Sequence, residues 1–108
     1  MKRGDLVTVS LPGAYGKPRP AMVIQSDMFA EHSSVTLLPF SSHVIDAEII
    51  RVTVQPSEQN GLTKICQVAV DKAQTIPREK VGPTFGKINA KTLEVIERNL
   101  SLFMGIAK

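Results

Sequence analysis

The strongest constraint on the fold is a series of short apolar runs, rich in β-branched residues, that end at proline, glycine or polar clusters. Runs of this kind are typical of β-strands, and the Pro and Gly signals between them are typical of turns. We expect strands over residues 5–10, 21–25, 34–38, 48–54 and 63–70, and a short one over 73–76. Pro39 is expected to end the third strand. Residues 81–88 are rich in turn formers and predict at most a brief edge strand.

The hydrophobic period changes at Asn89. This residue is suited to cap a helix, because its side chain accepts hydrogen bonds from free backbone N–H groups. Apolar residues then recur at spacings of three and four along one face, at Leu93, Ile96, Leu100 and Phe103. The helix is expected to end near Gly105. The sequence therefore predicts one domain over residues 1–108, with a mainly β fold: a small antiparallel sheet or half-barrel closed by a C-terminal helix.

Length and composition exclude several classes of protein. A chain of 108 residues, 43% hydrophobic and 21% charged, is neither disordered nor fibrous and has room for one core. Its apolar stretches fall far short of the roughly 20 residues that span a bilayer, and its basic start lacks the apolar core of a secretory signal. We therefore expect a cytoplasmic protein without membrane contacts. Cys66 is the only cysteine, which excludes an intrachain disulfide and favours a buried thiol.

Charge is distributed unevenly, although the net charge is only +3. Both ends of the chain are basic, and the middle, over residues 20–63, is acidic. Basic ends that converge in the fold would attract a polyanion, whereas the acidic middle argues against indiscriminate coating of nucleic acid. A solvated surface of mixed sign explains the composition equally well.

Familiar catalytic signatures are missing from the sequence. His32 and His43 form no metal-binding pattern, and we expect both on surface loops. Neither a glycine-rich phosphate loop nor a GxSxG motif occurs. Ser41 and Ser42 precede His43, but adjacent strand residues point to opposite faces, so a Ser/His pair is not favoured. The sequence therefore predicts neither a metal nor a cofactor.

Two polar loops carry the side chains that remain. A cationic loop runs from Gly13 to Arg19, and a second loop holds Ser41, Ser42 and His43; each lies next to an expected buried strand. If those strands are neighbours, the loops meet at one phosphate, with Arg19 as a bidentate donor and a serine hydroxyl as a second donor. The alternative to a phosphate site is that Arg19 lies on a rigid loop and that it and the serines are simply solvated.

Four motifs of the sequence resemble MazF/PemK-type toxins of bacterial toxin–antitoxin modules. They are the start Arg3-Gly4-Asp5, the segment 17–25 (KPRPAMVIQ), the strand end Pro39-Phe40-Ser41 and the segment 71–76 (DKAQTI). Together with the final helix, the resemblance covers nearly the whole chain.

The resemblance implies a dimeric, SH3-like barrel that cuts single-stranded RNA, including mRNA, at short sequences without a metal. The RNA's own 2′-hydroxyl would be the nucleophile. Arg19 matches the family arginine that contacts the scissile phosphate and assists proton transfer, and Ser41 matches the hydroxyl residue after the third strand. The resemblance also implies a cognate antitoxin, and we expect this partner to neutralise the toxin through an acidic, partly disordered tail.

RNA contacts are expected at further residues of the two loops and of the fourth motif. These residues are Tyr15, Lys17, Ser42, His43, Asp71 and Lys72. Three positions depart from the family pattern: Ser41 replaces a more frequent threonine, Lys72 replaces a frequent glutamine, and Ala69 stands where some members have a catalytic arginine. Catalysis is therefore expected to depend mainly on Arg19.

A second resemblance leads to a different function. Residues 99–106 and Gln25-Ser26-Asp27 are similar to CcdB-type toxins, which share the fold but bind and poison DNA gyrase. Met104 stands where that branch has a tryptophan, and this removes the stacking surface expected of a binding hot spot. We therefore favour the ribonuclease and keep the gyrase poison as the alternative. An inactive family member that only binds is a third interpretation, because of Ala69.

Overall fold

The computed structural model describes residues 1–10 and 17–107. Its strands are β1 (Asp5–Val9), β2 (Arg19–Val23), β3 (Ser34–Ser41), β4 (Arg51–Val54), β5 (Cys66–Ala69), β6 (Gln74–Pro77) and β7 (Val81–Lys87). The short 3-10 helices are η1 (Asp27–Phe29), η2 (Val70–Lys72) and η3 (Arg78–Lys80), and the α-helix α1 (Ala90–Phe103) comes last. The predicted class, mainly antiparallel β with a C-terminal helix, is confirmed.

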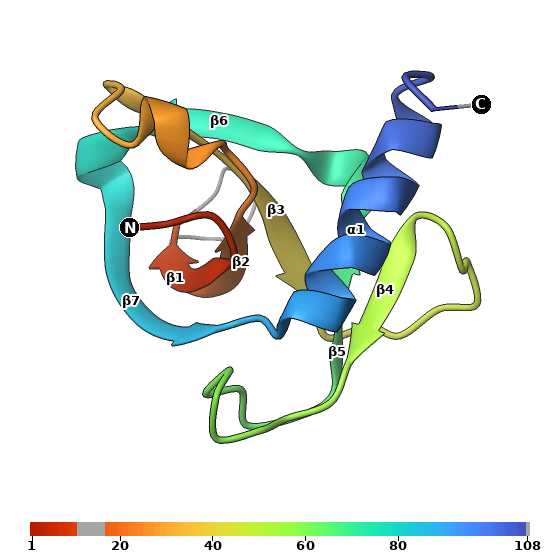
Figure 1. The fold of residues 1–108 in the computed structure, drawn as a ribbon. Helices are drawn as coiled ribbons and strands as arrows, with labels where there is room; N and C mark the ends of the chain where they lie inside the picture. Colours follow the sequence, from red (N-terminus) through yellow and green to blue (C-terminus); the bar gives the residue numbers. More distant parts are fainter. Residues whose placement is uncertain (11–16, 108) are drawn as a thin grey trace.

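The strands form one antiparallel sheet in the order β4-β5-β3-β2-β1-β7, and β6 also pairs with β3. β3 changes partner along its length, because residues 34–37 pair with β6 and residues 40–41 pair with β5. The sheet therefore has two parts that share β3. Figure 1 shows β4 beside α1, which also packs on η2.

Both faces of the central strands are buried, because successive side chains of a strand point to opposite sides. Leu6 and Leu38 lie in one apolar cluster together with Ile96 of α1. Their neighbours Val7 and Leu37 lie in a second cluster. Because both faces are buried, the second and third strands consist of continuous apolar residues instead of alternating apolar and polar ones.

The predicted start and end of the helix are confirmed. The side-chain oxygen of Asn89 accepts a hydrogen bond from the backbone N–H of Thr92 at 2.7 Å. The helix ends at Phe103, and Gly105 has a φ of 75°, which a glycine adopts without strain. In the described part of the chain, no helix is long and apolar enough to cross a membrane.

The prediction that Pro39 ends the third strand is wrong. β3 continues to Ser41, and Pro39 pairs with Ala21 of β2. Pro39 lies where β3 changes partner from β6 to β5, so the ladder on that edge is already interrupted. A proline, which has no N–H to donate, is tolerated at such a gap.

Other strand boundaries also differ from the prediction. β4 begins at Arg51, because residues 48–50 form a turn. The brief edge strand expected over 81–88 is the seven-residue β7, which pairs with β1 through two register shifts. Its glycines permit close approach of another backbone: a Cβ on Gly86 would lie 2.1 Å from the carbonyl oxygen of Asn60.

Candidate active site

The ends of β2 and β3 are neighbours, as the phosphate-site hypothesis requires. Ala21 pairs with Pro39, and continuing this antiparallel register by two residues places Arg19 opposite Ser41. Arg19 is exposed at the first position of β2, and Ser41 is half-buried at the last position of β3.

A pocket of about 160 Å³ opens beside these strand ends. The described residues that line it are Arg19, Pro20, Phe40, Ser42, Leu62, Thr63, Lys64 and Cys66. Arg19 and Lys64 are cations, and Ser42 and Thr63 carry hydroxyls. All four side chains are exposed, and none of the described lining residues is acidic. Phe40 and Cys66 are buried, at 7% and 4% exposure. The pocket therefore combines an apolar interior with a positively charged rim.

The hydroxyl of Ser41 closes a tight turn at the end of β3. It accepts a hydrogen bond from the backbone N–H of His43 at 3.2 Å and donates to the carbonyl oxygen of His43 at 3.3 Å. Ser41 is not among the described lining residues, whereas its neighbour Ser42 is. The bond that the Ser41 hydroxyl donates to the carbonyl oxygen of His43 is long for an O–H donor and therefore weak. Breaking it costs the hydroxyl little energy when another acceptor is available.

Gln67 fixes the segment that follows this turn. Its side chain is buried, and its amide pairs with both backbone groups of Ile45: it accepts from the N–H and donates to the carbonyl oxygen, each at 3.0 Å. It also donates to the hydroxyl of Thr53 at 3.1 Å. In the sequence, Gln67 is a single polar residue inside an apolar strand, and nothing local indicates its partner 22 residues away.

The loop between β4 and β5 supplies the other wall of the pocket. Asn60, only 5% exposed, accepts from the backbone N–H groups of Ser57 and Leu62 at 3.0 and 2.9 Å and donates to the carbonyl oxygen of Gln55 at 2.8 Å. These bonds close the loop on itself and set the position of Leu62 and the two residues after it. No motif or period of the sequence indicates a role for Thr63 or Lys64.

Asp71 and Lys72 lie elsewhere in the fold. The carboxylate of Asp71, in η2, forms an ion pair with Arg51 of β4, and the two side chains are 21% and 10% exposed. This pair ties η2 to β4 beside α1. Lys72 is exposed, and neither residue is among the described residues that line the pocket. Asp71, expected to contact RNA, therefore has a structural partner that the sequence did not indicate.

The remaining predicted contact residues flank the pocket in the chain. Lys17 is exposed two residues before Arg19, and His43 is exposed one residue after Ser42. Neither belongs to the described lining. Tyr15 lies outside the described residues.

Cys66 is the buried free thiol that the sequence predicts. Burial raises the pKa of this thiol above its usual value, and the nearby Lys64 opposes the shift only in part. The thiol is therefore protonated near neutral pH, which makes it a poor nucleophile.

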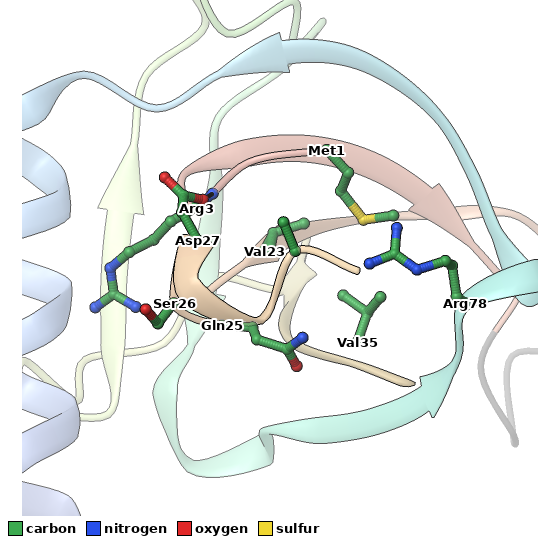
Figure 2. Close-up of a pocket in the computed structure, with 9 residues that line it drawn as sticks. Met1, Arg3, Val23, Gln25, Ser26, Asp27, Val35 and Arg78 are labelled. Atoms are coloured by element: carbon green, nitrogen blue, oxygen red, sulfur yellow. Dashed lines mark hydrogen bonds between the residues drawn. The ribbon is translucent and has the colours of Figure 1, made fainter. Parts of the chain in front are cut away.

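A second, much smaller hollow lies where the N-terminal segment meets η1 (Figure 2). Its volume is about 10 Å³, which is room for about one water molecule. Arg3, on its wall, is directed to α1, where its guanidinium forms an ion pair with Glu97 at 2.6 Å. This hollow is too small for a nucleotide.

Comparisons with known proteins agree on one family. Residues 2–104 match the family described as PemK-like, MazF-like toxin of type II toxin-antitoxin system. The chain is 37% identical over 108 residues to a probable endoribonuclease MazF from Mycolicibacterium smegmatis, and the match covers 99% of each chain.

Solved structures show the same fold at lower identity. An endoribonuclease in complex with its cognate antitoxin, from a mycobacterial species, has a TM-score of 0.83 at 18% identity and covers 100% of this chain and 98% of its own. A MazF toxin from Mycobacterium tuberculosis has a TM-score of 0.82 at 22% identity, and the match covers 96% of this chain and 99% of that toxin. Nearly full coverage by the family match and by a relative at 37% identity establishes that the chain belongs to the PemK-like, MazF-like toxins of type II toxin–antitoxin systems.

Proposed function

We propose that this toxin is an endoribonuclease that cleaves single-stranded RNA without a metal, at the site formed by Arg19 and the serines that end β3. The observation that carries the proposal is the antiparallel pairing of β2 and β3, which brings Arg19 at the start of β2 near the serines at the end of β3, beside a pocket with no described carboxylate. The full-length relative, named a probable endoribonuclease MazF, supports the same activity. It favours the ribonuclease over a CcdB-like gyrase poison.

The proposed reaction is an in-line attack of a ribose 2′-hydroxyl on the adjacent phosphorus. The bond to the 5′-oxygen of the next nucleotide breaks, which leaves a 2′,3′-cyclic phosphate and a 5′-hydroxyl. One proton leaves the 2′-hydroxyl, and one is delivered to the departing 5′-oxygen. Negative charge grows on the phosphate oxygens during this step, and fixed donors stabilise it.

Arg19 supplies a planar fork of N–H donors that matches two phosphate oxygens. Because an arginine side chain is almost never neutral, we assign it mainly to stabilising charge and to helping proton transfer, rather than to acting as a strict base. The hydroxyl of Ser41 would donate to a non-bridging oxygen after it leaves the carbonyl of His43, to which it donates at 3.3 Å.

The activity is tested by incubating the purified protein with a mixed pool of single-stranded RNA in EDTA. We expect cleavage that EDTA does not reduce, with 2′,3′-cyclic phosphate and 5′-hydroxyl ends on the products. Cleavage that stops in EDTA and returns with added divalent cations would contradict a mechanism carried by Arg19 and Ser41. An intact RNA pool together with inhibited gyrase would favour the CcdB-like alternative.

We also propose that an antitoxin with an acidic, partly disordered tail neutralises the toxin in the cytoplasm. The exposed cations Lys17, Arg19 and Lys64 offer such a tail complementary charge. The solved endoribonuclease with its cognate antitoxin supports this partner class.

We propose a homodimer as the functional unit. A domain of 11.8 kDa buries a small share of its surface, and self-association covers more of it. Several apolar side chains remain exposed on and after α1, among them Phe103, Met104 and Ile106 at 49%, 60% and 77%. Native mass measurement at micromolar concentration is expected to give twice the chain mass. A species of 11.8 kDa alone would contradict the dimer.

A further inference from the structure

We propose that the pocket beside Arg19 receives one unstacked nucleobase of the RNA, that Lys64 holds the phosphate next to it together with Arg19, and that Thr63 contacts the edge of the base. This inference rests on the proposed function and adds a recognition subsite to it.

The lining of the pocket matches the chemistry of a single nucleotide. Pro20, Phe40, Leu62 and Cys66 offer apolar surface to a flat ring, and Arg19 and Lys64 at the rim offer positive charge to a phosphate. Proteins that read single-stranded RNA commonly take an unpaired base out of the stack and pack it against such surface. No described lining residue is acidic, so nothing in the described pocket repels the phosphate.

The size of the pocket limits the occupant. At about 160 Å³ it is smaller than the roughly 300 Å³ at which pockets for drug-sized ligands begin. It has room for one ring system and excludes two stacked bases. Because its polar rim includes Arg19 and Ser42 from the strand ends, the bound base would belong to a nucleotide close to the scissile phosphate.

The wall that contacts the base is held in place before RNA binds. The side chain of Asn60 makes three hydrogen bonds within its own loop. In one of them its oxygen accepts from the backbone N–H of Leu62 at 2.9 Å. Leu62 packs against the apolar core, and the next two residues project to the rim. A preformed wall lowers the entropy lost when a ligand binds, and it lets a hydroxyl discriminate between base edges.

Thr63 and Lys64 have separable roles. A threonine hydroxyl both donates and accepts a hydrogen bond, so it can distinguish bases by the groups on their edges. A lysine ammonium bound to phosphate adds affinity without sequence information. Changes at Thr63 are therefore expected to alter which RNA sequence is cut, and changes at Lys64 to lower cleavage at all sequences alike.

The test uses a pool of randomised single-stranded RNA, cut by the wild type and by four variants and sequenced at the cut ends. Thr63→Val removes the hydroxyl and is expected to reduce the preference at one nucleotide position about 3- to 10-fold. Thr63→Trp fills the pocket from its exposed rim and should abolish that preference. Ile65→Trp places the same ring on the same loop outside the described lining, and it should cut like the wild type. Lys64→Ala should slow cleavage at all sequences alike. It should also reduce the steepness with which the logarithm of the RNA-binding constant falls against the logarithm of salt concentration, by about 0.7.

The outcomes separate this inference from the proposed function. If the wild type cuts RNA and both Thr63 variants keep its sequence preference, the subsite is wrong while the ribonuclease stands. If the Thr63 variants lose only the ability to be neutralised by the antitoxin, the pocket is an antitoxin site, which also overturns the proposal. If the wild type binds RNA without cutting it, sequencing the bound fraction gives the same preference measurement, and loss of preference in Thr63→Trp supports the subsite. A wild type that neither binds nor cuts RNA overturns both.

Discussion

Replacing Arg19 with alanine is expected to lower the rate of RNA cleavage by about 10²–10³, the usual effect of removing one donor that stabilises transition-state charge. The fold should persist, because Arg19 is exposed at the first position of β2, and among residues 1–10 and 17–107 no buried group is bonded to its side chain. The measurement is single-turnover cleavage of a short RNA, with circular dichroism of each variant. Arg19→Lys keeps the charge but loses the planar fork, and we expect it to recover only part of the rate.

The control for this experiment is Arg98→Ala, which removes an exposed arginine from α1. It should cut RNA like the wild type. Arg19→Lys with full activity would show that a bidentate clamp is not needed. His43→Ala tests the remaining alternative, because a large loss of rate there would identify the histidine as the base that takes the 2′-hydroxyl proton.

Replacing Gly86 with alanine is expected to destabilise the protein by about 3 kcal/mol or more. The added Cβ would lie 2.1 Å from the carbonyl oxygen of Asn60 and 2.4 Å from its carbonyl carbon, so a backbone segment has to move. The segment that moves carries Asn60, whose hydrogen bonds hold the wall of the pocket. We therefore expect RNA cleavage to fall even at temperatures where the variant remains folded.

Chemical denaturation of the Gly86→Ala variant measures the loss of stability, and Gly105→Ala is the matched control. Gly105 has a φ of 75°, and beyond its chain neighbours no atom of the described residues would lie within 4 Å of a Cβ added there, so alanine meets backbone strain but no clash with them. Its cost should be about 1 kcal/mol. Equal losses at Gly86 and Gly105 would show that the contact with Asn60 relaxes without cost.

Periodicity predicts best where one local rule decides the structure. The helix has a capping residue, a 3.6-residue period and a terminal glycine, and all three agree. Proline and glycine usually end strands, but Pro39 lies within β3 and the glycines lie within β7. There the tertiary context overrides the local rule. The proline lies at a gap between two partner strands, and Gly86 serves a backbone contact with a residue 26 positions earlier.

The candidate site follows the same division. The proximity of Arg19 and Ser41 is predictable, because both residues lie at strand ends that an antiparallel pair brings together. The presence of Lys64 in the pocket is not predictable, since it depends on where the loop between β4 and β5 lies relative to the ends of β2 and β3. The ion pair of Asp71 with Arg51 likewise joins residues 20 positions apart, and no spacing rule for a strand or helix connects them.

The loop around Asn60 separates two tasks of the protein, because it is held by its own hydrogen bonds and by β7. Its internal hydrogen bonds to Gln55, Ser57 and Leu62 hold its shape without help from the strand ends that carry Arg19 and Ser41. Substitutions at positions 63 and 64 are therefore expected to alter the pocket wall while the sheet keeps Arg19 and Ser41, the proposed catalytic residues, in place. If Thr63 reads the RNA as we propose, the target sequence of the toxin can be exchanged by editing a few loop residues, in evolution or by a protein engineer.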